Sequence, residues 1–229
     1  MSAAEVGRLD AIEIETGPAP GTSVIWMHGL GADGHDFVPI VPELGLPAAP
    51  AARFVFPHAP MRPVTINAGM VMRAWYDVFE LGAGPEDEAG IRASQALVEA
   101  LIAREQSRGV AAGGIVLAGF SQGGVMALQT GLRHPERLAG IMALSCHVPL
   151  ARTLAAETSA ASLDVPLFMA HGIYDDLIPV ALARRSRDLL QKLGYRVEWR
   201  EYPMAHSVSA EEIGDISRWL RGALGLGTG

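Results

Sequence analysis

Cysteine, net positive charge and long apolar runs are scarce in this sequence, and each scarcity excludes a class of protein. The single cysteine, Cys146, excludes an intrachain disulfide and a metal site caged by cysteines, and it is typical of a reducing compartment. The 18 Lys and Arg residues are outnumbered by 25 Asp and Glu residues, so the chain lacks the basic footprint of a nucleic-acid-binding protein. The longest apolar tracts, such as Leu138–Leu144, have the length of a strand and fall far short of a membrane span.

The N-terminal segment shows no sign of a targeting signal. Residues 1–20 carry acids at Glu5, Asp10, Glu13 and Glu15 and no apolar stretch suited to a secretory signal. We therefore expect a soluble, cytoplasmic protein with no stable membrane insertion and no nucleic-acid partner.

The composition is that of a folded globular protein. Hydrophobic residues make up 49% of the 229 residues and charged residues 19%, which excludes intrinsic disorder. Area scaling predicts that a chain of this size buries about 70% of its unfolded surface. No repeat or low-complexity linker interrupts the chain, so we predict a single domain over residues 1–229.

Short apolar runs alternate with segments of helix length, a rhythm that indicates a mostly parallel sheet covered by helices. The central runs are apolar without alternation, as expected where both faces of a sheet are buried. The alternating run Arg196–Tyr202 suits a position nearer the edge, and a weaker strand is predicted at Ala11–Glu15. The other predicted strands are Ser23–His28, Arg53–Phe56, Ile115–Gly119, Leu138–Ser145 and Pro166–Ala170.

Helices are predicted between these runs, at Pro85–Ser107, Pro179–Leu193 and Ser209–Ala223. The last begins with a capping box, Ser209 and Glu212. The proline-rich segment Gly45–Pro63 is predicted to be a surface loop around one strand.

The motif that carries chemistry is Gly119-Phe120-Ser121-Gln122-Gly123, with an apolar strand before it and a helix-forming segment after it. In α/β-hydrolases this arrangement of strand, tight turn and helix lifts a nucleophilic serine clear of the sheet. The two glycines are needed because side chains there would collide with neighbouring backbone. The alternative, a glycine-rich turn without chemistry, is disfavoured by the strand and helix on either side.

A serine hydroxyl needs a base to take its proton and a carboxylate to orient that base. These partners follow the serine in the order acid, then histidine. Of the later histidines, His147, His171 and His206, we assign the base to His206, because it follows the last strand and precedes the terminal helix. His171 is expected to brace its loop. Asp175 and Asp176 both fit the acid, and spacing alone does not choose between them.

The developing oxyanion also needs donors. One is expected from the backbone N–H of Gln122, the residue after the serine, and the other from Leu30 in the glycine-rich turn that follows the strand Ser23–His28. This turn lacks the Lys-Ser/Thr of a phosphate-binding loop, so it implies no cofactor. No His/Asp/Glu cluster has the spacing of metal ligands, and we predict no metal.

Other features have plainer interpretations. Met70 and Trp75 are predicted to line an acyl pocket, with simple packing as the alternative. We expect Cys146 to be inert, because nothing around it lowers a thiol pKa. The clusters Arg184, Arg185 and Arg187, and Glu211 with Glu212, are predicted to be solvated helix faces.

With these residues assembled, the chain resembles the phospholipase/carboxylesterase family of small α/β-hydrolases, which includes the acyl-protein thioesterases. The resemblance implies an α/β-hydrolase fold without a large lid domain and selects Asp175 as the acid beside Ser121 and His206, with Leu30 and Gln122 as oxyanion donors. It also implies that a homodimer is possible. Cys146-His147 departs from the family's usual glycine and large residue. The matching stretches are Met27–Gly31, Phe56–Pro60, Arg62–Asn67, Met72–Asp77, Gly119–Gly124, His171-Gly172 with Asp175, and Met204–His206.

The predicted function is that of a serine carboxylesterase, which hydrolyses short- to medium-chain carboxylic esters through an acyl-enzyme on Ser121. The alternative is an acyl-protein thioesterase or lysophospholipase that acts on long acyl chains. Under either function the predicted partner is a small-molecule ester or thioester substrate. A rival from another class, a receptor that binds an acyl compound without turnover, would be expected to lack a member of the triad.

Overall fold

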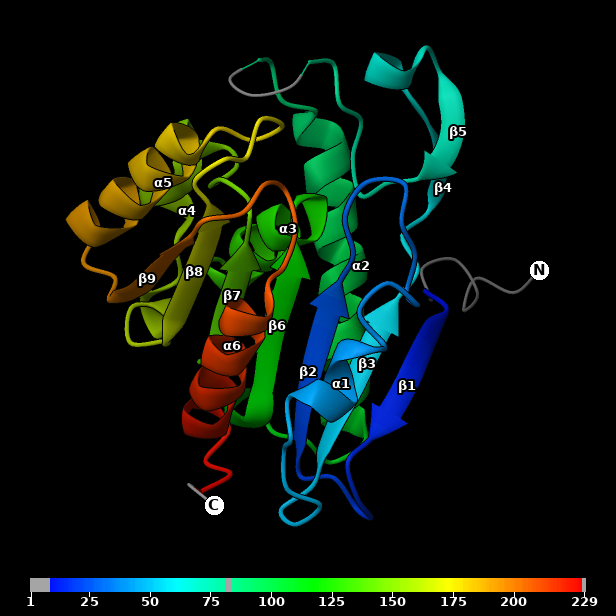
Figure 1. Cartoon of the computed structure of the whole chain (residues 1–229), viewed down its shortest axis with the longest axis vertical. Coiled ribbons are helices and arrows are strands. Elements are labelled where there is room, and N and C mark those ends of the chain that lie inside the picture. Colours follow the sequence, from blue (N-terminus) through cyan, green and yellow to red (C-terminus); the bar gives the residue numbers. More distant parts are fainter. Residues whose placement is uncertain (1–8, 81–83, 228–229) are drawn as a thin grey trace.

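A seven-stranded sheet forms the centre of the computed structural model, which describes residues 9–80 and 84–227 (Figure 1). The strand order is β1-β3-β2-β6-β7-β8-β9, and β1 alone runs antiparallel to its neighbour in this sheet. The mostly parallel α/β-hydrolase sheet expected from the sequence is therefore confirmed, with the alternating strand β9 at one edge. The strands are β1 (Ala11–Glu15), β2 (Thr22–Met27), β3 (Ala52–Pro57), β6 (Ile115–Phe120), β7 (Gly140–Leu144), β8 (Leu167–Gly172) and β9 (Val197–Tyr202).

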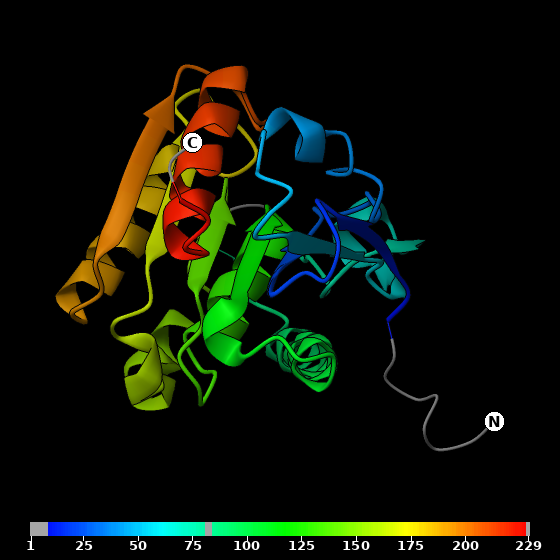
Figure 2. The same cartoon turned by 90° about the horizontal axis from the view of Figure 1, so that it is seen from below.

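Helices cover both faces of the sheet, as the view from below shows (Figure 2). One face carries α1 (Ile40–Glu43) and α6 (Ala210–Ala223). The other carries α2 (Glu88–Ser107), α3 (Gln122–Gly131), α4 (Ala151–Glu157) and α5 (Val180–Lys192). Alternate residues of each central strand enter opposite cores. In β2, for example, Val24 and Trp26 face α1 and α6, while Ile25 and Met27 face α2 and α3.

The segment Gly45–Pro63, predicted to be a surface loop around one strand, contains β3 and ends in the first three residues of a second strand. Beyond β3, the chain forms a hairpin of β4 (Met61–Val64) and β5 (Met70–Arg73), joined by a 3₁₀ turn at Thr65–Asn67. Pro63 sits in this small sheet, where the ladder has only two strands and a missing donor is tolerated. Further short elements that the sequence did not suggest are α1, α4 and the 3₁₀ turns Ala112–Gly114 and Ala160–Ser162.

Capping residues set the starts of the long helices. Asp87 accepts the N–H of Gly90, so α2 begins at Glu88, three residues later than predicted. Ser209 accepts the N–H of Glu212 and starts α6 as predicted. The interpretation of Glu212 as solvated was wrong, because the sheet-facing side of α6 carries it into the interior, where its exposed fraction is 0%.

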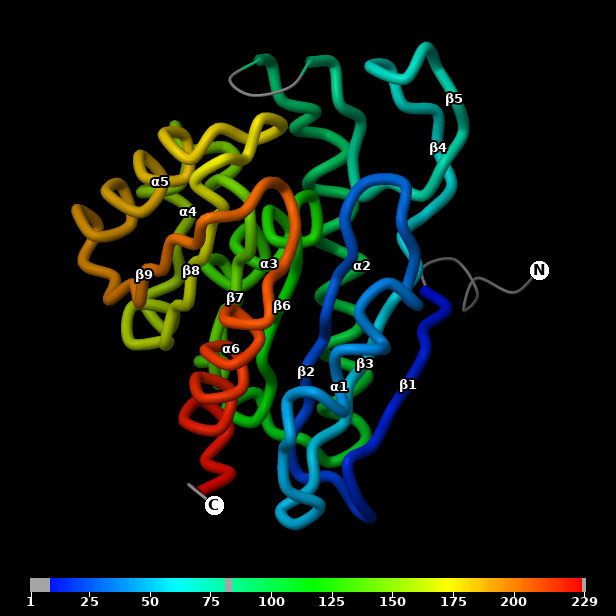
Figure 3. The backbone as a smooth tube through the Cα atoms, viewed as in Figure 1, coloured from blue at the N-terminus to red at the C-terminus, as the bar shows by residue number. Residues whose placement is uncertain are grey.

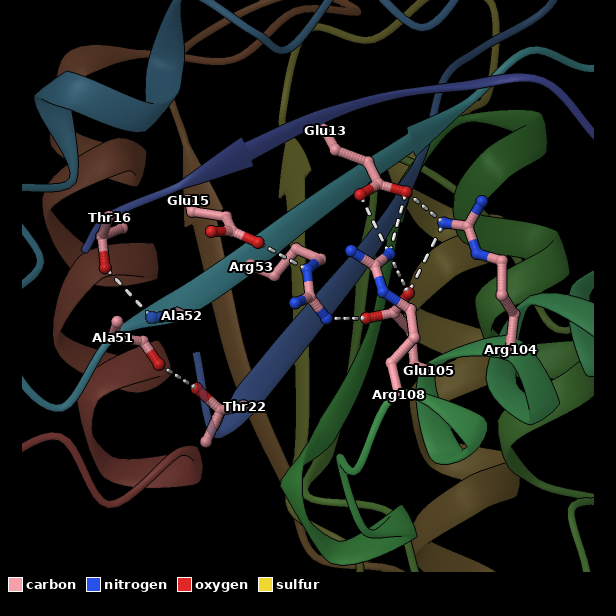
Figure 4. Close-up of polar contacts among 10 residues, drawn as sticks. All are labelled: Glu13, Glu15, Thr16, Thr22, Ala51, Ala52, Arg53, Arg104, Glu105 and Arg108. Atoms are coloured by element: carbon pink, nitrogen blue, oxygen red, sulfur yellow. Dashed lines mark hydrogen bonds and ion pairs between the residues drawn. The ribbon is translucent and has the colours of Figure 1, made fainter. Parts of the chain in front are cut away.

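An ion-pair network fastens the C-terminal end of α2 to the β1 edge of the sheet (Figure 4). Arg53 of β3 lies between Glu15 of β1, at 3.0 Å, and Glu105 of α2, at 2.9 Å. Arg108 joins Glu105 to Glu13. Arg53 and Glu105 are both buried, so each needs the other to compensate its lost hydration.

The loops that follow β2, β6, β8 and β9 meet at one end of the sheet (Figure 3). Ligands bind at this carboxyl end of the strands in open α/β sheets. Within the two described ranges, no helix is long and apolar enough to cross a membrane, and no group of three or more His, Cys, Asp and Glu residues is placed to hold a metal ion.

Candidate active site

Ser121 occupies a strained turn between β6 and α3. Its φ of 54° and ψ of −121° lie where side chains are rarely found, and the geometry is held by a hydrogen bond from its N–H to the carbonyl of Leu144. The flanking glycines permit this. A Cβ on Gly123 would lie 2.1 Å from the carbonyl oxygen of Met27, and one on Gly119 would lie 2.1 Å from the carbonyl carbon of Gly123. The glycines of the sequence motif are therefore steric requirements of the turn.

The loop after β8 brings an acid to a histidine. Oδ2 of Asp175 lies 2.7 Å from Nδ1 of His206, while Oδ1 accepts the N–H groups of Leu177 and Ile178 at 3.0 and 2.8 Å. Asp175 is 6% exposed, whereas Asp176 points to solvent. Of the two aspartates that spacing could not separate, Asp175 is thus the one in contact with His206.

His171 braces this loop, as the sequence suggested. Its Nε2 lies 2.7 Å from the carbonyl oxygen of Ile178 and 3.3 Å from Oδ2 of Asp175, two acceptors that place the hydrogen on Nε2. Burial lowers the pKa of His171, so it remains neutral here. The next residue, Gly172, packs against the loop that carries His206, since a Cβ there would lie 2.3 Å from the carbonyl oxygen of Ala205.

The turn after β2 is held by a neutral histidine. Ala59 donates its N–H to Nε2 of His28 at 3.0 Å, so Nδ1 carries the hydrogen and donates it to the carbonyl of Gly29 at 2.7 Å. Burial lowers the pKa of His28, which keeps this tautomer in place. The turn then presents Leu30 to the cavity beside Ser121.

Gln122 is fixed by its side chain. Its Oε1 accepts the N–H of Trp75 at 3.0 Å, and its Nε2 donates to the carbonyl of Tyr76 at 2.9 Å. As the first residue of α3, Gln122 has a backbone N–H with no partner inside the helix. Both residues predicted to supply oxyanion amides therefore lie beside Ser121 on restrained backbone.

The two predicted pocket residues lie elsewhere, and this prediction was wrong. Trp75 is fully buried behind the site, where its indole donates to the carbonyl of His28. Met70 is 64% exposed on the β4–β5 hairpin. Neither lines the cavity, because Trp75 is used for packing and the hairpin projects away from the ends of the central strands.

A cavity of about 290 Å³ lies where the loops that carry Ser121, His206 and Leu30 meet. Ser121, His206, Leu30 and Gln122 all line it, together with an apolar wall formed by Tyr76, Val78, Phe79, Phe120, Leu177 and Ile178. The ring of His206 packs on Phe120, the residue before Ser121, with ring centroids 4.7 Å apart. Phe120 belongs to the motif around Ser121, but Val78, Phe79, Leu177 and Ile178 come from loops without a motif, so sequence reasoning missed them.

Two further side chains near the cavity bear on its chemistry. His147 follows β7 and lines the cavity, and burial, aided by nearby His171, lowers its pKa to about 4. Cys146 is buried against α3, and burial raises the pKa of its thiol. A neutral thiol is a poor nucleophile, in keeping with the inert role expected for it.

A parallel sheet with a serine on a strained strand-to-helix turn, and an Asp–His pair on later loops of the same edge, is the architecture of an α/β-hydrolase of the serine-hydrolase class. Comparison with known proteins agrees. The family model described as Phospholipase/Carboxylesterase matches residues 10–224, and the chain belongs to this family.

The relatives and solved structures that match do so over most of the chain. The chain is 40% identical over 208 residues to the acyl-protein thioesterase 1 of Neurospora crassa, covering 86% of this chain and 85% of the relative. It is 36% identical over 225 residues to that of Gibberella zeae, covering 94% and 96%. Among solved structures, SOBER1 of Arabidopsis thaliana superposes with a TM-score of 0.84 at 31% identity, covering 89% of this chain and 99% of that one. Acyl-protein thioesterase 2 of Zea mays gives 0.81 at 29% identity, covering 94% and 100%.

Proposed function

We propose that this serine hydrolase cleaves acyl thioesters, passing the acyl group through an ester with Ser121. The observation that carries the proposal is the hydrogen bond between Asp175 and His206, made at the cavity that Ser121 also lines. The relatives at 35–40% identity, whose names are those of acyl-protein thioesterases, favour a thioester over the short-chain carboxylic ester expected from the sequence alone.

Acylation uses the strained serine and the oriented histidine. With its Nδ1–H donated to Asp175, the His206 ring keeps a lone pair on Nε2 for the Ser121 proton. The Oγ of Ser121 attacks the carbonyl carbon, a C–O bond forms, and the N–H groups of Leu30 and Gln122 stabilise the oxyanion. The C–S bond then breaks, and His206 gives its proton to the departing sulfur.

Deacylation repeats these steps with water. His206 takes a proton from water, the hydroxide attacks the acyl-Ser121 carbonyl, and the C–O bond to Ser121 breaks as His206 returns the proton to Oγ. The released products are a carboxylic acid and free enzyme.

The size of the cavity supports a second candidate. About 290 Å³ lies at the lower end of small-molecule pockets, which suits a short or medium acyl chain. A carboxylesterase for short- to medium-chain esters uses the same residues and differs only in the leaving group.

The test compares matched substrates with the same acyl chain, one an S-acyl and one an O-acyl compound, from acetyl to palmitoyl. We expect higher kcat/KM for the thioesters, and an acyl adduct on Ser121 visible by mass spectrometry after rapid quenching. Ser121→Ala should lower turnover by about 10⁴-fold or more. Ser107→Ala, at the exposed end of α2, is the matched control and should leave turnover unchanged.

The outcomes separate the candidates. Preference for short O-acyl compounds over the matched thioesters would support the second candidate. Full turnover by Ser121→Ala would overturn both.

A further inference from the structure

The charged side chains that line the cavity all have the same sign. They are Asp36, Asp77, Glu80 and Glu86, and no Lys or Arg side chain of the described residues lines it with them. In the proposed function the apolar wall takes the acyl chain, which would leave these carboxylates to face the part of the substrate beyond the reacting bond. The four carboxylates differ in whether neighbouring groups of the protein compensate their charge.

Asp77 is compensated within the protein. Its two carboxylate oxygens accept the N–H and hydroxyl of Thr65 at 2.7 and 2.6 Å. Burial opposes ionisation, but these bonds and nearby Arg62 outweigh it and lower the pKa of Asp77. Its charge is therefore already used to hold the β4–β5 hairpin.

Glu86 is held in place by the backbone. Both its oxygens accept the N–H of Leu150, at 3.0 and 3.1 Å. The nearest histidine, His147, has its Nε2 4.0 Å away, yet its low pKa leaves it neutral. Glu86 therefore presents a carboxylate that His147 does not pair with as a cation.

Asp36 and Glu80 are exposed at the cavity, one on the loop after β2 and the other on the segment between β5 and α2. Although its side chain reaches solvent, the surrounding residues remove part of the hydration of Asp36 and raise its pKa, and nearby Asp33, another carboxylate, adds to this shift. A carboxylate destabilised by its own surroundings gains from a cation brought by a ligand.

We propose that the carboxylates Asp36 and Glu80, with Glu86 beside them, select acyl thioesters whose leaving group is cationic, as in an acylated cysteine flanked by basic residues of a peptide. This inference rests on the proposed function. An opening of one charge sign raises the local concentration of oppositely charged substrate and repels the same sign. The net charge of −7 adds to this field at longer range, although solvent ions screen it beyond about 8 Å at physiological salt.

The test uses three peptides that carry the same S-octanoyl cysteine and differ only in flanking residues: arginine, glutamine or glutamate. For the wild type we expect kcat/KM to fall in that order, with a gap that narrows between 20 and 500 mM salt. Each partly exposed charge pair contributes up to about 1 kcal/mol, or roughly a fivefold effect. Asp36→Asn with Glu80→Gln should therefore reduce the ratio of kcat/KM for the arginine peptide to that for the glutamine peptide by about 25-fold at most, and the ratio of arginine to glutamate peptide by more.

The control variant removes two acids at the opposite end of the sheet. Glu136 precedes β7 and Glu198 lies at the start of β9; both are exposed and neither lines the cavity. Glu136→Gln with Glu198→Gln changes the net charge by the same amount and should keep the wild-type ratio.

The results distinguish this inference from the proposed function. If the wild type hydrolyses the glutamine peptide but shows no difference between arginine and glutamate peptides, the charge selection is wrong and the thioesterase proposal stands. If no peptide is hydrolysed while a neutral S-octanoyl thiol is, the peptide leaving group is wrong. If both double variants reduce the ratio equally, the long-range field is responsible and the assignment to Asp36 and Glu80 fails.

Discussion

Gln122 and Trp75 hold each other in place. Oε1 of Gln122 accepts the backbone N–H of Trp75 at 3.0 Å, so the buried support behind the cavity is bound to the residue proposed to supply an oxyanion amide. The same side chain also binds the carbonyl of Tyr76. We call these two hydrogen bonds of the Gln122 side chain the clamp. Loss of the clamp would displace both the backbone N–H of Gln122 and Tyr76 in the cavity wall.

Gln122→Met tests the clamp, because it keeps the volume and removes both hydrogen bonds. We expect kcat to fall by about 10- to 100-fold with a smaller change in KM, since misplacing a donor weakens transition-state binding. Gln129→Met is the control: Gln129 is also buried in α3 but donates to Gln95, away from the cavity. Equal losses of kcat in the two variants would show that the effect is structural.

Asp175 and Asp176 offer a matched pair of substitutions. Asp175→Asn keeps the shape of the side chain but alters its hydrogen bond to His206, and we expect kcat to fall by about 10⁴-fold. Asp176→Asn changes a solvated neighbour and should alter kcat by no more than a few-fold. Steady-state kinetics on one thioester decides between them, and a larger loss in Asp176→Asn would reassign the acid.

Glu212 should make stability depend on pH. Burial raises its pKa to about 8, while an exposed glutamate titrates near 4.5. The stabilisation that comes from keeping the proton in the folded state is complete below pH 4.5 and is lost as the pH rises through 8. Between pH 4.5 and pH 8, each rise of one pH unit lowers the free energy of unfolding by about 1.4 kcal/mol, compared with a residue at this position that does not titrate.

Glu212→Gln removes this titration. As the pH rises from 5 to 9, we expect the melting temperature of this variant to increase relative to that of the wild type. Glu211→Gln, the exposed neighbour, should follow the wild type. Parallel profiles for the wild type and Glu212→Gln would contradict the assignment.

For the buried pair Glu105 and Arg53 we expect the opposite dependence of stability on pH. Burial disfavours the charge of Glu105, but Arg53 and Arg108 outweigh burial and lower its pKa. The stabilisation from Glu105 is fully present above the pKa that this carboxyl has in the unfolded chain. It is lost as the pH falls through the lower pKa of the folded protein. Glu105→Ala leaves Arg53 buried without this partner and should cost about 3 kcal/mol.

Urea unfolding at pH 7 and pH 4 measures this loss, which should be smaller at the lower pH. Glu88→Ala removes an exposed i,i+4 partner of Arg92 and should cost about 0.5 kcal/mol. A loss in Glu105→Ala no larger than in this control would show that the buried network contributes little.

Patterns that act over a few residues were predictable. The apolar runs located the five central strands β3, β2, β6, β7 and β8, because burial on both faces leaves a direct compositional trace. The half-buried edge strand β9 was located by its alternating pattern, and the edge strand β1 only as a weaker run. The motif around Ser121 located the strained turn, because its glycines meet backbone within the same strand–helix unit or on the adjacent strand. Ser209 likewise predicted the start of α6 through a contact only three residues long.

Features that depend on contacts distant in the sequence were not predictable. The fastening of Trp75 to Gln122 spans 47 residues, and nothing near Trp75 distinguished such packing from a pocket wall. Spacing could not choose between Asp175 and Asp176, because the choice depends on which carboxylate the loop turns toward His206.

The sequence by itself determined the order of strands and helices, the sharp turn at Ser121 and the edge at which later polar loops gather, because these follow from local sterics and from strand direction. Only the tertiary structure decided that Glu212 is buried, that Trp75 supports the site from behind and that uncompensated carboxylates face the cavity. Those properties arise from the packing of several distant segments, and burial and charge compensation at a residue are set by all of its neighbours in space.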